Sequence, residues 1–285
     1  MQTLTDAAEP AYPSPPEEPA LRRARDLLAQ PGVLVLTGAG VSTDSGIPDY
    51  RGPGAPRRTP MRFSEFVSGP KAQQRYWARS HLGWQRMAGS EPNAGHRALA
   101  SMERQGRVSA VITQNVDGLH RRAGSEVVVD LHGRVSDVVC LTCRDRSSRV
   151  ALHQRLAELN PRFGAGVDVG IAPDGDVDLE QVGGFRVAGC RHCGGPLKPD
   201  VVFFGENVPR ERVDRCYALV ERARALLVAG SSLAVLSGLR FVRHAHRAGI
   251  PVVLVNRGTT RGDDLATVKL DAGCSETLGL FASSG

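Results

Sequence analysis

Five short apolar runs of this chain each end in a cluster of small or polar residues. They span residues 34–36, 111–112, 127–129, 226–228 and 252–255. Stretches with helical periodicity lie between them, and alternating strands and helices predict an α/β fold with a doubly wound, Rossmann-like parallel sheet. Ligands of such sheets bind beyond the carboxyl ends of the strands, so the five clusters predict one shared crevice.

The first of these runs leads into the turn Thr37-Gly38-Ala39-Gly40. Glycines here let the backbone approach a phosphate, and a helix that begins after such a turn presents free N–H groups to an anion. The glycine pair is also compatible with an ordinary tight βα turn. Residue 43 is Thr where the dehydrogenase fingerprint has its third glycine, and no acidic strand end follows about 20 residues later. A hydride-transfer enzyme is therefore disfavoured, and ribose contacts are expected from Ser231, Ser232 and Asn256.

His132 follows an apolar run and precedes Gly133, which leaves space for its ring. An imidazole that titrates near neutral pH suits general-base catalysis, and the predicted crevice favours this role over a structural one. Most of the other histidines are expected on helices or in structural positions, namely His81, His96, His120, His153, His244 and His246.

Four of the six cysteines form the pairs Cys140-x-x-Cys143 and Cys190-x-x-Cys193. Four thiolates complete a tetrahedral zinc site and leave no open position, which predicts one structural Zn²⁺; a redox pair is the alternative. We expect Cys216 in a helix core and Cys274 in a late loop, either lining a pocket or packed. Without a secretory segment or an apolar run of about 18 residues, this pattern favours reduced thiols, a cytoplasmic location and no membrane span.

The chain divides into three predicted regions. Residues 1–19, rich in proline, are expected to be a disordered lead-in. Residues 20–137 and 199–283 are predicted to form the Rossmann-like domain, with a helical cofactor-loop insertion at about 52–92. Residues 138–198 are predicted to be a zinc-ribbon module without a long helix. The net charge of +6 comes from interspersed charges, which suits an anionic cofactor but does not predict nucleic-acid binding.

Taken together, the motifs of residues 20–283 resemble those of sirtuins, which are NAD-dependent protein-lysine deacylases. The resemblance rests on the segments 38–51, 113–120, 132–133, 198–206 and 230–233, on Asn256 and on both cysteine pairs. It implies that the acyl oxygen of a modified lysine attacks the ribose of NAD as nicotinamide leaves. His132 would deprotonate a ribose hydroxyl, and O-acyl-ADP-ribose and free lysine would be the products.

The same resemblance implies roles for individual residues. Besides His132, it assigns catalytic roles to Asn115 and Asp117. The residues implied in NAD binding are Gly38, Ala39, Gly40, Asp49, Tyr50, Arg51, Gln114, Asn115, Asp117, Gly230, Ser231, Ser232, Asn256, Arg257 and Cys274. The residues implied in binding an extended substrate peptide by strand addition are Val202, Phe203, Phe204, Gly205, Glu206, Ala234 and Val235.

Two departures from the common sirtuin pattern concern the substrate. Tyr50 stands where many members have Phe, and Ser237 stands where proline is frequent. With residues 74–80, these features are most similar to the class II, mitochondrial-type branch, known for removing lipoyl and other long acyl groups. Tyr76 and Arg79 have the spacing of the pair that reads acidic acyl groups in the desuccinylase branch, although an exposed helix face is the simpler interpretation.

Two other functions use the same cofactor site. A protein mono-ADP-ribosyltransferase differs only in the acceptor, and a non-catalytic NAD or ADP-ribose sensor lacks turnover altogether. A nucleic-acid-binding zinc module is the weakest alternative, because the cysteine-containing segment lacks interleaved aromatic residues and a basic stripe.

Overall fold

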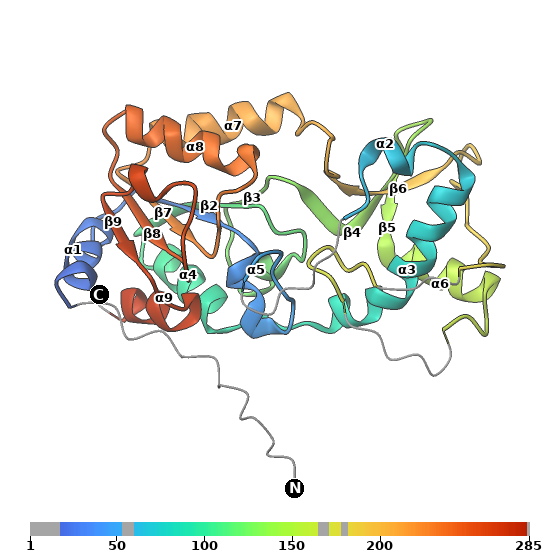
Figure 1. Cartoon of the computed structure of the whole chain (residues 1–285), viewed down its shortest axis with the longest axis horizontal. Helices are drawn as coiled ribbons and strands as arrows, with labels where there is room; N and C mark the ends of the chain where they lie inside the picture. The colour runs from blue at the N-terminus through green and yellow to red at the C-terminus, as the bar shows by residue number, and fades with distance from the viewer. Residues whose placement is uncertain (1–17, 53–59, 165–170, 178–181, 284–285) are drawn as a thin grey trace, which may run out of the picture.

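The computed structural model describes residues 18–52, 60–164, 171–177 and 182–283 (Figure 1). The predicted lead-in therefore lies almost entirely outside the described residues, apart from Glu18 and Pro19, which begin the first helix. None of the described helices is long and apolar enough to cross a membrane.

Six parallel strands form the large sheet, in the order β3-β2-β1-β7-β8-β9. In chain order they are β1 (Val33–Thr37), β2 (Val108–Thr113), β3 (Val128–Asp130), β7 (Ala225–Ala229), β8 (Val252–Val255) and β9 (Val268–Leu270). Strand order reverses between β1 and β7, which is the topological switch point where such sheets bind ligands. The Rossmann-like parallel sheet predicted from the alternating pattern is confirmed.

Both faces of the large sheet are covered by helices (Figure 1). Val33 and Val35 of β1 belong to a core shared with α1 (Glu18–Leu28), α4 (Ala94–Arg104) and α9 (Cys274–Ala282). Leu34 and Leu36 point the other way, into a core shared with α7 (Arg210–Glu221) and α8 (Leu236–Arg247). A strand buried on both faces is apolar at every position, and the run 33–36 shows this pattern. Cys216 of α7 is fully buried in the second core, as predicted.

A second, antiparallel sheet lies beside the first and has the order β5-β4-β6. Its strands are β4 (Gly133–Cys140), β5 (Arg146–Ser148) and β6 (Leu197–Val201). Three helices share one core with it: α2 (Phe63–Phe66), α3 (Pro70–Gly89) and α6 (Arg149–Leu159). The indole N–H of Trp77 on α3 donates to the carbonyl of Leu197 on β6, at 3.0 Å. We therefore propose that the small unit includes α2 and α3, which sequence analysis assigned to an insertion of the large domain.

Two helices differ from the predictions. The small unit does contain a helix of eleven residues, α6. Its buried positions are Arg149, Leu152 and Leu156, so a charged residue on the inner face hides the apolar period. Cys274, predicted in a late loop, is the first residue of α9. Short elements complete the chain: α5 (Leu119–Arg122), η1 (Ala39–Val41), η2 (Thr43–Ser45) and η3 (Asp263–Leu265).

Candidate active site

A cavity of about 680 Å³ opens at the carboxyl ends of β1, β2 and β7. His132 lines it, together with every residue that the resemblance assigned to NAD or to substrate. It therefore joins segments that lie as far apart in the sequence as Gly38 and Cys274. The predicted convergence of strand ends on one crevice agrees with this arrangement.

The turns after β1 and β7 are in contact at the switch point through three glycines, Gly38, Gly40 and Gly230. A Cβ on Gly38 would lie 2.7 Å from the carbonyl oxygen of Gly230, and a Cβ on Gly230 would lie 2.3 Å from the nitrogen of Val41. Gly230 also has φ +60°, a conformation that favours glycine. The glycines are thus required for the two turns to approach each other. For Gly38 and Gly40, the sequence leaves open a phosphate cradle and an ordinary tight turn. Instead of a helix, two short 3₁₀ turns, η1 and η2, follow β1.

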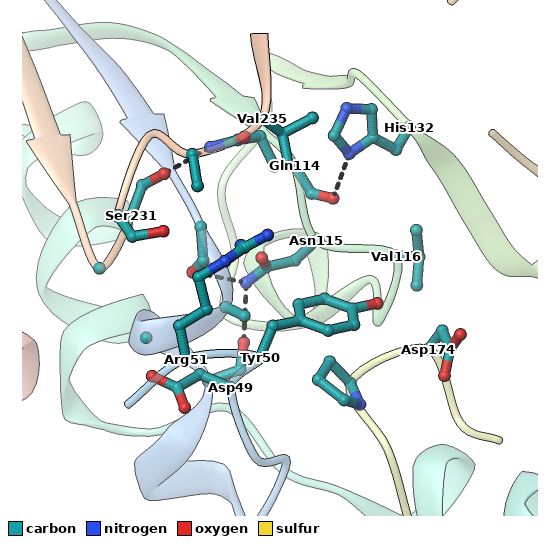
Figure 2. Close-up of a pocket in the computed structure, with 18 of the residues that line it drawn as sticks. Asp49, Tyr50, Arg51, Gln114, Asn115, Val116, His132, Asp174, Ser231 and Val235 are labelled. Atoms are coloured by element: carbon teal, nitrogen blue, oxygen red, sulfur yellow. Dashed lines mark hydrogen bonds between the residues drawn. The ribbon is translucent and has the colours of Figure 1, made fainter. Parts of the chain in front are cut away.

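His132 is held through both ring nitrogens. Its Nδ1 lies 2.9 Å from the carbonyl oxygen of Gln114 (Figure 2). A carbonyl only accepts hydrogen bonds, so Nδ1 carries the proton and Nε2 is left with a lone pair. Ser237 Oγ lies 2.8 Å from this Nε2. Burial lowers the pKa of His132 to about 4, with Arg212 lowering it further and the Gln114 hydrogen bond opposing this shift. The ring is therefore neutral, and able to accept a proton, at pH 7.

Asn115 and Asp117 belong to one buried hydrogen-bond network. The Asn115 amide donates to the Gly38 carbonyl and to Ser42 Oγ, both at 3.0 Å (Figure 2). Ser42 Oγ in turn donates to the carboxylate of Asp117 at 2.7 Å, and the other carboxylate oxygen accepts from the Leu119 N–H at 2.9 Å. Burial raises the pKa of Asp117, and the hydrogen bonds from Leu119 and Ser42 oppose that shift. The network fixes the Asn115 side chain beside the turn that follows β1.

Gln114 connects three elements around the cavity. Its amide donates to Ser231 Oγ at 2.9 Å, which ties the end of β2 to the turn after β7 (Figure 2). On the other side, a Cβ on Gly238 of α8 would lie 2.6 Å from Gln114 Oε1. Close packing therefore holds the start of α8 against the residue that orients His132.

The predicted peptide-binding edge forms one wall of the cavity. Phe204 is 36% exposed and makes an edge-on contact with Tyr50, with ring centroids 5.9 Å apart. Phe203 is buried between Phe66 and Tyr76. The Glu206 carboxylate accepts from the Phe203 N–H at 2.9 Å and pairs with the buried Lys198 ammonium at 3.0 Å. Glu206 therefore supports the edge by fixing its backbone.

Two carboxylates of the small unit also reach the cavity. Asp174 and Asp176 line it together with Tyr76 (Figure 2 shows Asp174). Asp176 forms an ion pair with Arg79 on α3, at 3.7 Å. Burial raises the pKa of Tyr76, and both carboxylates raise it further. Neither residue was among the predicted site residues, because both stand in a Gly/Asp-rich stretch about 100 positions after Tyr76, with no motif around them.

The four paired cysteines form a separate cluster at the end of the small sheet. Their sulfur atoms all lie within 4.8 Å of one another. Cys140 and Cys193 are 3.5 Å apart and Cys143 and Cys190 are 3.8 Å apart, measured between sulfurs. Four sulfurs at about 2.3 Å from a tetrahedral zinc ion would be about 3.8 Å apart. Backbone N–H groups of His192 and Gly195 point at two of the sulfurs, each at 3.4 Å, as expected for metal-binding thiolates. The geometry fits zinc.

Comparison with known proteins identifies the family. A family model described as "Sir2 family" matches residues 38–237. The chain belongs to the Sir2 family. The matched segment holds the turn after β1, the general-base candidate, the cysteine cluster and the start of α8, so the resemblance noted from the motifs is confirmed at the level of the family.

Curated relatives match nearly the whole chain. "NAD-dependent protein deacetylase 1" of Mycobacterium avium is 54% identical over 260 residues, covering 90% of this chain and 92% of the relative. "NAD-dependent protein deacetylase 1" of Streptomyces coelicolor is 57% identical over 265 residues, covering 92% of this chain and 88% of the relative. Among solved structures, one described as "Sir2-p53 peptide-NAD+" has a TM-score of 0.74 at 32% identity, covering 93% of this sirtuin and 98% of that chain.

Several lining residues of this sirtuin were absent from the predicted site. Ser42 and Val116 stand inside the motif segments 38–51 and 113–120. Their position beside predicted site residues could therefore have identified them from the sequence. Ser237 was noted only for the missing proline. Its contact with His132 depends on where α8 begins relative to the large sheet, and no local pattern reports that.

Proposed function

We infer that this sirtuin is an NAD-dependent protein-lysine deacylase that transfers the acyl group to ADP-ribose. The names of the relatives in Mycobacterium avium and Streptomyces coelicolor support the class of reaction and do not favour ADP-ribosyl transfer or NAD sensing. The observation that carries the proposal for this chain is the neutral His132 in a cavity shared with all the proposed NAD and peptide residues.

The lining of the cavity suits a dinucleotide. Arg257 lies against Gly273, the residue before α9, since a Cβ there would be 2.7 Å from Arg257 Nη2. A guanidinium beside a helix N-terminus favours an anionic group such as a diphosphate, and Arg51 adds a second cation to the lining. When bound, NAD supplies a ribose carbon that accepts the acyl oxygen, and nicotinamide, free lysine and O-acyl-ADP-ribose are the products.

Within this reaction, His132 accepts a proton at Nε2. Its Nδ1–H remains bonded to the Gln114 carbonyl, which holds the ring and stabilises the imidazolium that forms. Asn115 and Asp117 act through their network with Ser42, which keeps the Asn115 amide in place beside the turn after β1. No protein nucleophile takes part in this scheme.

The acylated lysine of a protein substrate enters between two segments of the cavity wall. We assign one side to residues 202–206 and the other to Ala234 and Val235, which line the same cavity. On the first side the Phe204 carbonyl already accepts from the Phe63 N–H at 3.0 Å. A peptide added as a strand would therefore bond to the backbone on the cavity side of this wall.

The acyl group that we propose is neutral. Arg79 is paired with Asp176, and Asp174 adds a second carboxylate near Tyr76. Like charges repel, so this wall disfavours succinyl and similar acidic chains although the Tyr76-x-x-Arg79 spacing is present. The same reasoning agrees with placement in the class II branch, which we propose from Tyr50, Ser237 and residues 74–80.

Asp176→Asn tests the acyl preference. The substitution removes the Asp176 carboxylate and its ion pair with Arg79, and we expect the ratio of kcat/KM for succinyl-lysine to that for acetyl-lysine to rise about fivefold, or about 1 kcal/mol. Glu158→Gln, an exposed carboxylate on α6 of the same unit, is the matched control and should leave the ratio unchanged. An unaltered ratio in Asp176→Asn contradicts the proposed acyl selectivity.

Mass spectrometry of an acyl-peptide incubation with NAD tests the reaction itself. A panel of acetyl, lipoyl, long-chain and succinyl peptides should yield deacylated peptide and acylated ADP-ribose in equal amounts. ADP-ribosylated peptide without acylated ADP-ribose would favour the transferase alternative, and NAD binding without any product would favour the sensor.

We also propose that the cysteine cluster holds one structural Zn²⁺ and that the protein acts in the cytoplasm. Four thiols at tetrahedral spacing support the first proposal. All six cysteines of the chain are free of disulfides, which supports the second.

A further inference from the structure

Among the described residues, Ser237 forms a hydrogen bond to His132 that has no role in the reaction proposed above. It is the second residue of α8 and lines the same cavity. Its Oγ lies 2.8 Å from Nε2, the nitrogen that must accept the proton. Because Nδ1 carries the ring proton, Ser237 is the donor in this bond and Nε2 is the acceptor.

The backbone of Ser237 is held on both sides. The N–H groups of Gly238 and Leu239 donate to the Val235 carbonyl, at 3.2 and 3.3 Å. Gly238 packs directly on Gln114, whose carbonyl binds the other ring nitrogen. The two groups that hold the imidazole therefore belong to one packed unit.

We propose that Ser237 is a positioning residue for the general base, an inference that rests on the proposed deacylase function. Before reaction, its hydroxyl donates to Nε2, fixing the ring orientation and the Nδ1–H tautomer. Because Nε2 has a single lone pair, the Ser237 hydroxyl turns away from it as the ribose hydroxyl donates its proton, and the hydroxyl then accepts from the new Nε2–H. The proton ends on Nε2, the Nδ1–H bond to Gln114 persists, and Ser237 keeps its own hydrogen.

A hydroxyl group is suited to this exchange because it both donates and accepts. Proline, which is frequent at this position in sirtuins, has no hydroxyl group. In this chain, the substitution Ser237→Ala removes the hydroxyl group without altering the backbone. Threonine retains the hydroxyl. These two substitutions separate the hydrogen bond from the packing of α8.

The first measurement is made on the free protein. In ¹⁵N NMR of histidine-labelled enzyme, with His132 assigned by its absence in His132→Ala, we expect one Nδ1–H tautomer with a hydrogen-bonded Nε2. In Ser237→Ala the Nε2 resonance should move downfield, as for a lone pair that has lost its donor. Ser237→Thr should resemble the wild type. An Nε2 resonance that is identical in wild type and Ser237→Ala would overturn the assignment.

The second measurement divides the reaction into two parts. Exchange of labelled nicotinamide reports cleavage of the nicotinamide bond, whereas O-acyl-ADP-ribose formation also requires the proton transfer to His132. Ser237→Ala should keep exchange within about twofold and lose about tenfold in product formation, the scale of one hydrogen bond to a group that becomes charged. Ser237→Thr should restore product formation.

Equal loss of both rates in Ser237→Ala, or product formation as fast as in wild type, contradicts the proposal. Thermal unfolding of both variants shows whether α8 has been disturbed. If either variant is unstable, the wild-type NMR spectrum still tests the proposal, because an Nε2 resonance typical of a lone pair without a hydrogen-bond donor would contradict it. Failure of the proposed function itself would look different, because the wild type would then form no acylated ADP-ribose.

Discussion

The two sheets of this sirtuin place their functional residues in different ways. The cavity at the large sheet collects side chains from segments between Gly38 and Cys274, and apolar cores on both faces hold those segments. The cysteine cluster takes its four sulfurs from two local turns at the end of a small sheet, of which one strand, β5, is exposed throughout. In the large sheet the fold creates the site, whereas in the small unit we propose that the bound metal supports the fold.

The largest expected effect comes from removing the metal. Structural zinc sites contribute on the order of 10 kcal/mol to the folding of small modules. Chelation, or Cys140→Ser, should unfold the antiparallel sheet while β1, β2 and β7 stay folded. Hydrogen exchange should show lost protection in the small unit, including β4 and β6, but not in β1, β2 and β7, and deacylation should fall indirectly.

Cys216→Ser, a buried cysteine outside the cluster, is the control for the loss of a thiol. It should leave the metal content at one ion per chain. Full activity in a protein verified to be free of metal would contradict this view of the small unit.

The next effect concerns chemistry at the large sheet and leaves the fold unchanged. His132→Ala should reduce product formation by about 10²–10⁴, the usual range for losing a general base, and NAD binding measured by calorimetry should persist. His246→Ala, on the exposed side of α8, is the control and should retain full turnover. Turnover that survives in His132→Ala would remove this residue from the mechanism.

Gly230→Ala tests whether the switch point depends on close contact. The added Cβ would meet Val41 at 2.3 Å in a residue with φ +60°, so we expect the free energy of unfolding to fall by about 2–4 kcal/mol. Gly249→Ala has a similar φ of +71° with no atom within 4 Å. It should therefore lose only about 1 kcal/mol, the cost of the conformation alone. If urea denaturation gives the same loss in the free energy of unfolding for Gly230→Ala and Gly249→Ala, the contact between residue 230 and Val41 contributes nothing.

Acid should lower the free energy of unfolding of both sheets, because buried histidines are neutral in the folded protein. The effect of each histidine should be smaller than that of Gly230→Ala. Burial lowers the pKa of His81, in the small unit, to about 4 and does the same to His96 and His132 beside the large sheet. Between about pH 6.5 and 4 the unfolded chain binds protons that the folded chain does not, so stability present above pH 6.5 is lost as the pH falls.

By pH 5 each histidine should contribute a loss on the order of 1 kcal/mol in the free energy of unfolding. Denaturant titrations at pH 7, 6 and 5 measure it, and His96→Gln should reduce the slope. A free energy of unfolding that is constant from pH 7 to 5 would contradict these protonation states.

Much of this architecture was predictable because it is local. Runs such as 33–36 are apolar at every position, and only a strand covered on both faces produces that pattern. Helix α6 was missed because Arg149 occupies an inner position between Trp77 and Trp84, where stacking on the two indoles replaces apolar packing. Helix α9 lacked a recognisable start, since Gly273 provides no side-chain cap.

The sequence alone predicted a parallel sheet, a ligand crevice at the strand ends, a four-cysteine metal site and a histidine base. Each depends on spacing within a few residues or on alternation along the chain. Only the tertiary structure decided that Gly38 packs against Gly230, that Asp176 forms an ion pair with Arg79, and that Ser237 forms a hydrogen bond with His132. These contacts join residues far apart in the sequence, and their distances follow from how helices and sheets pack, which no local pattern encodes.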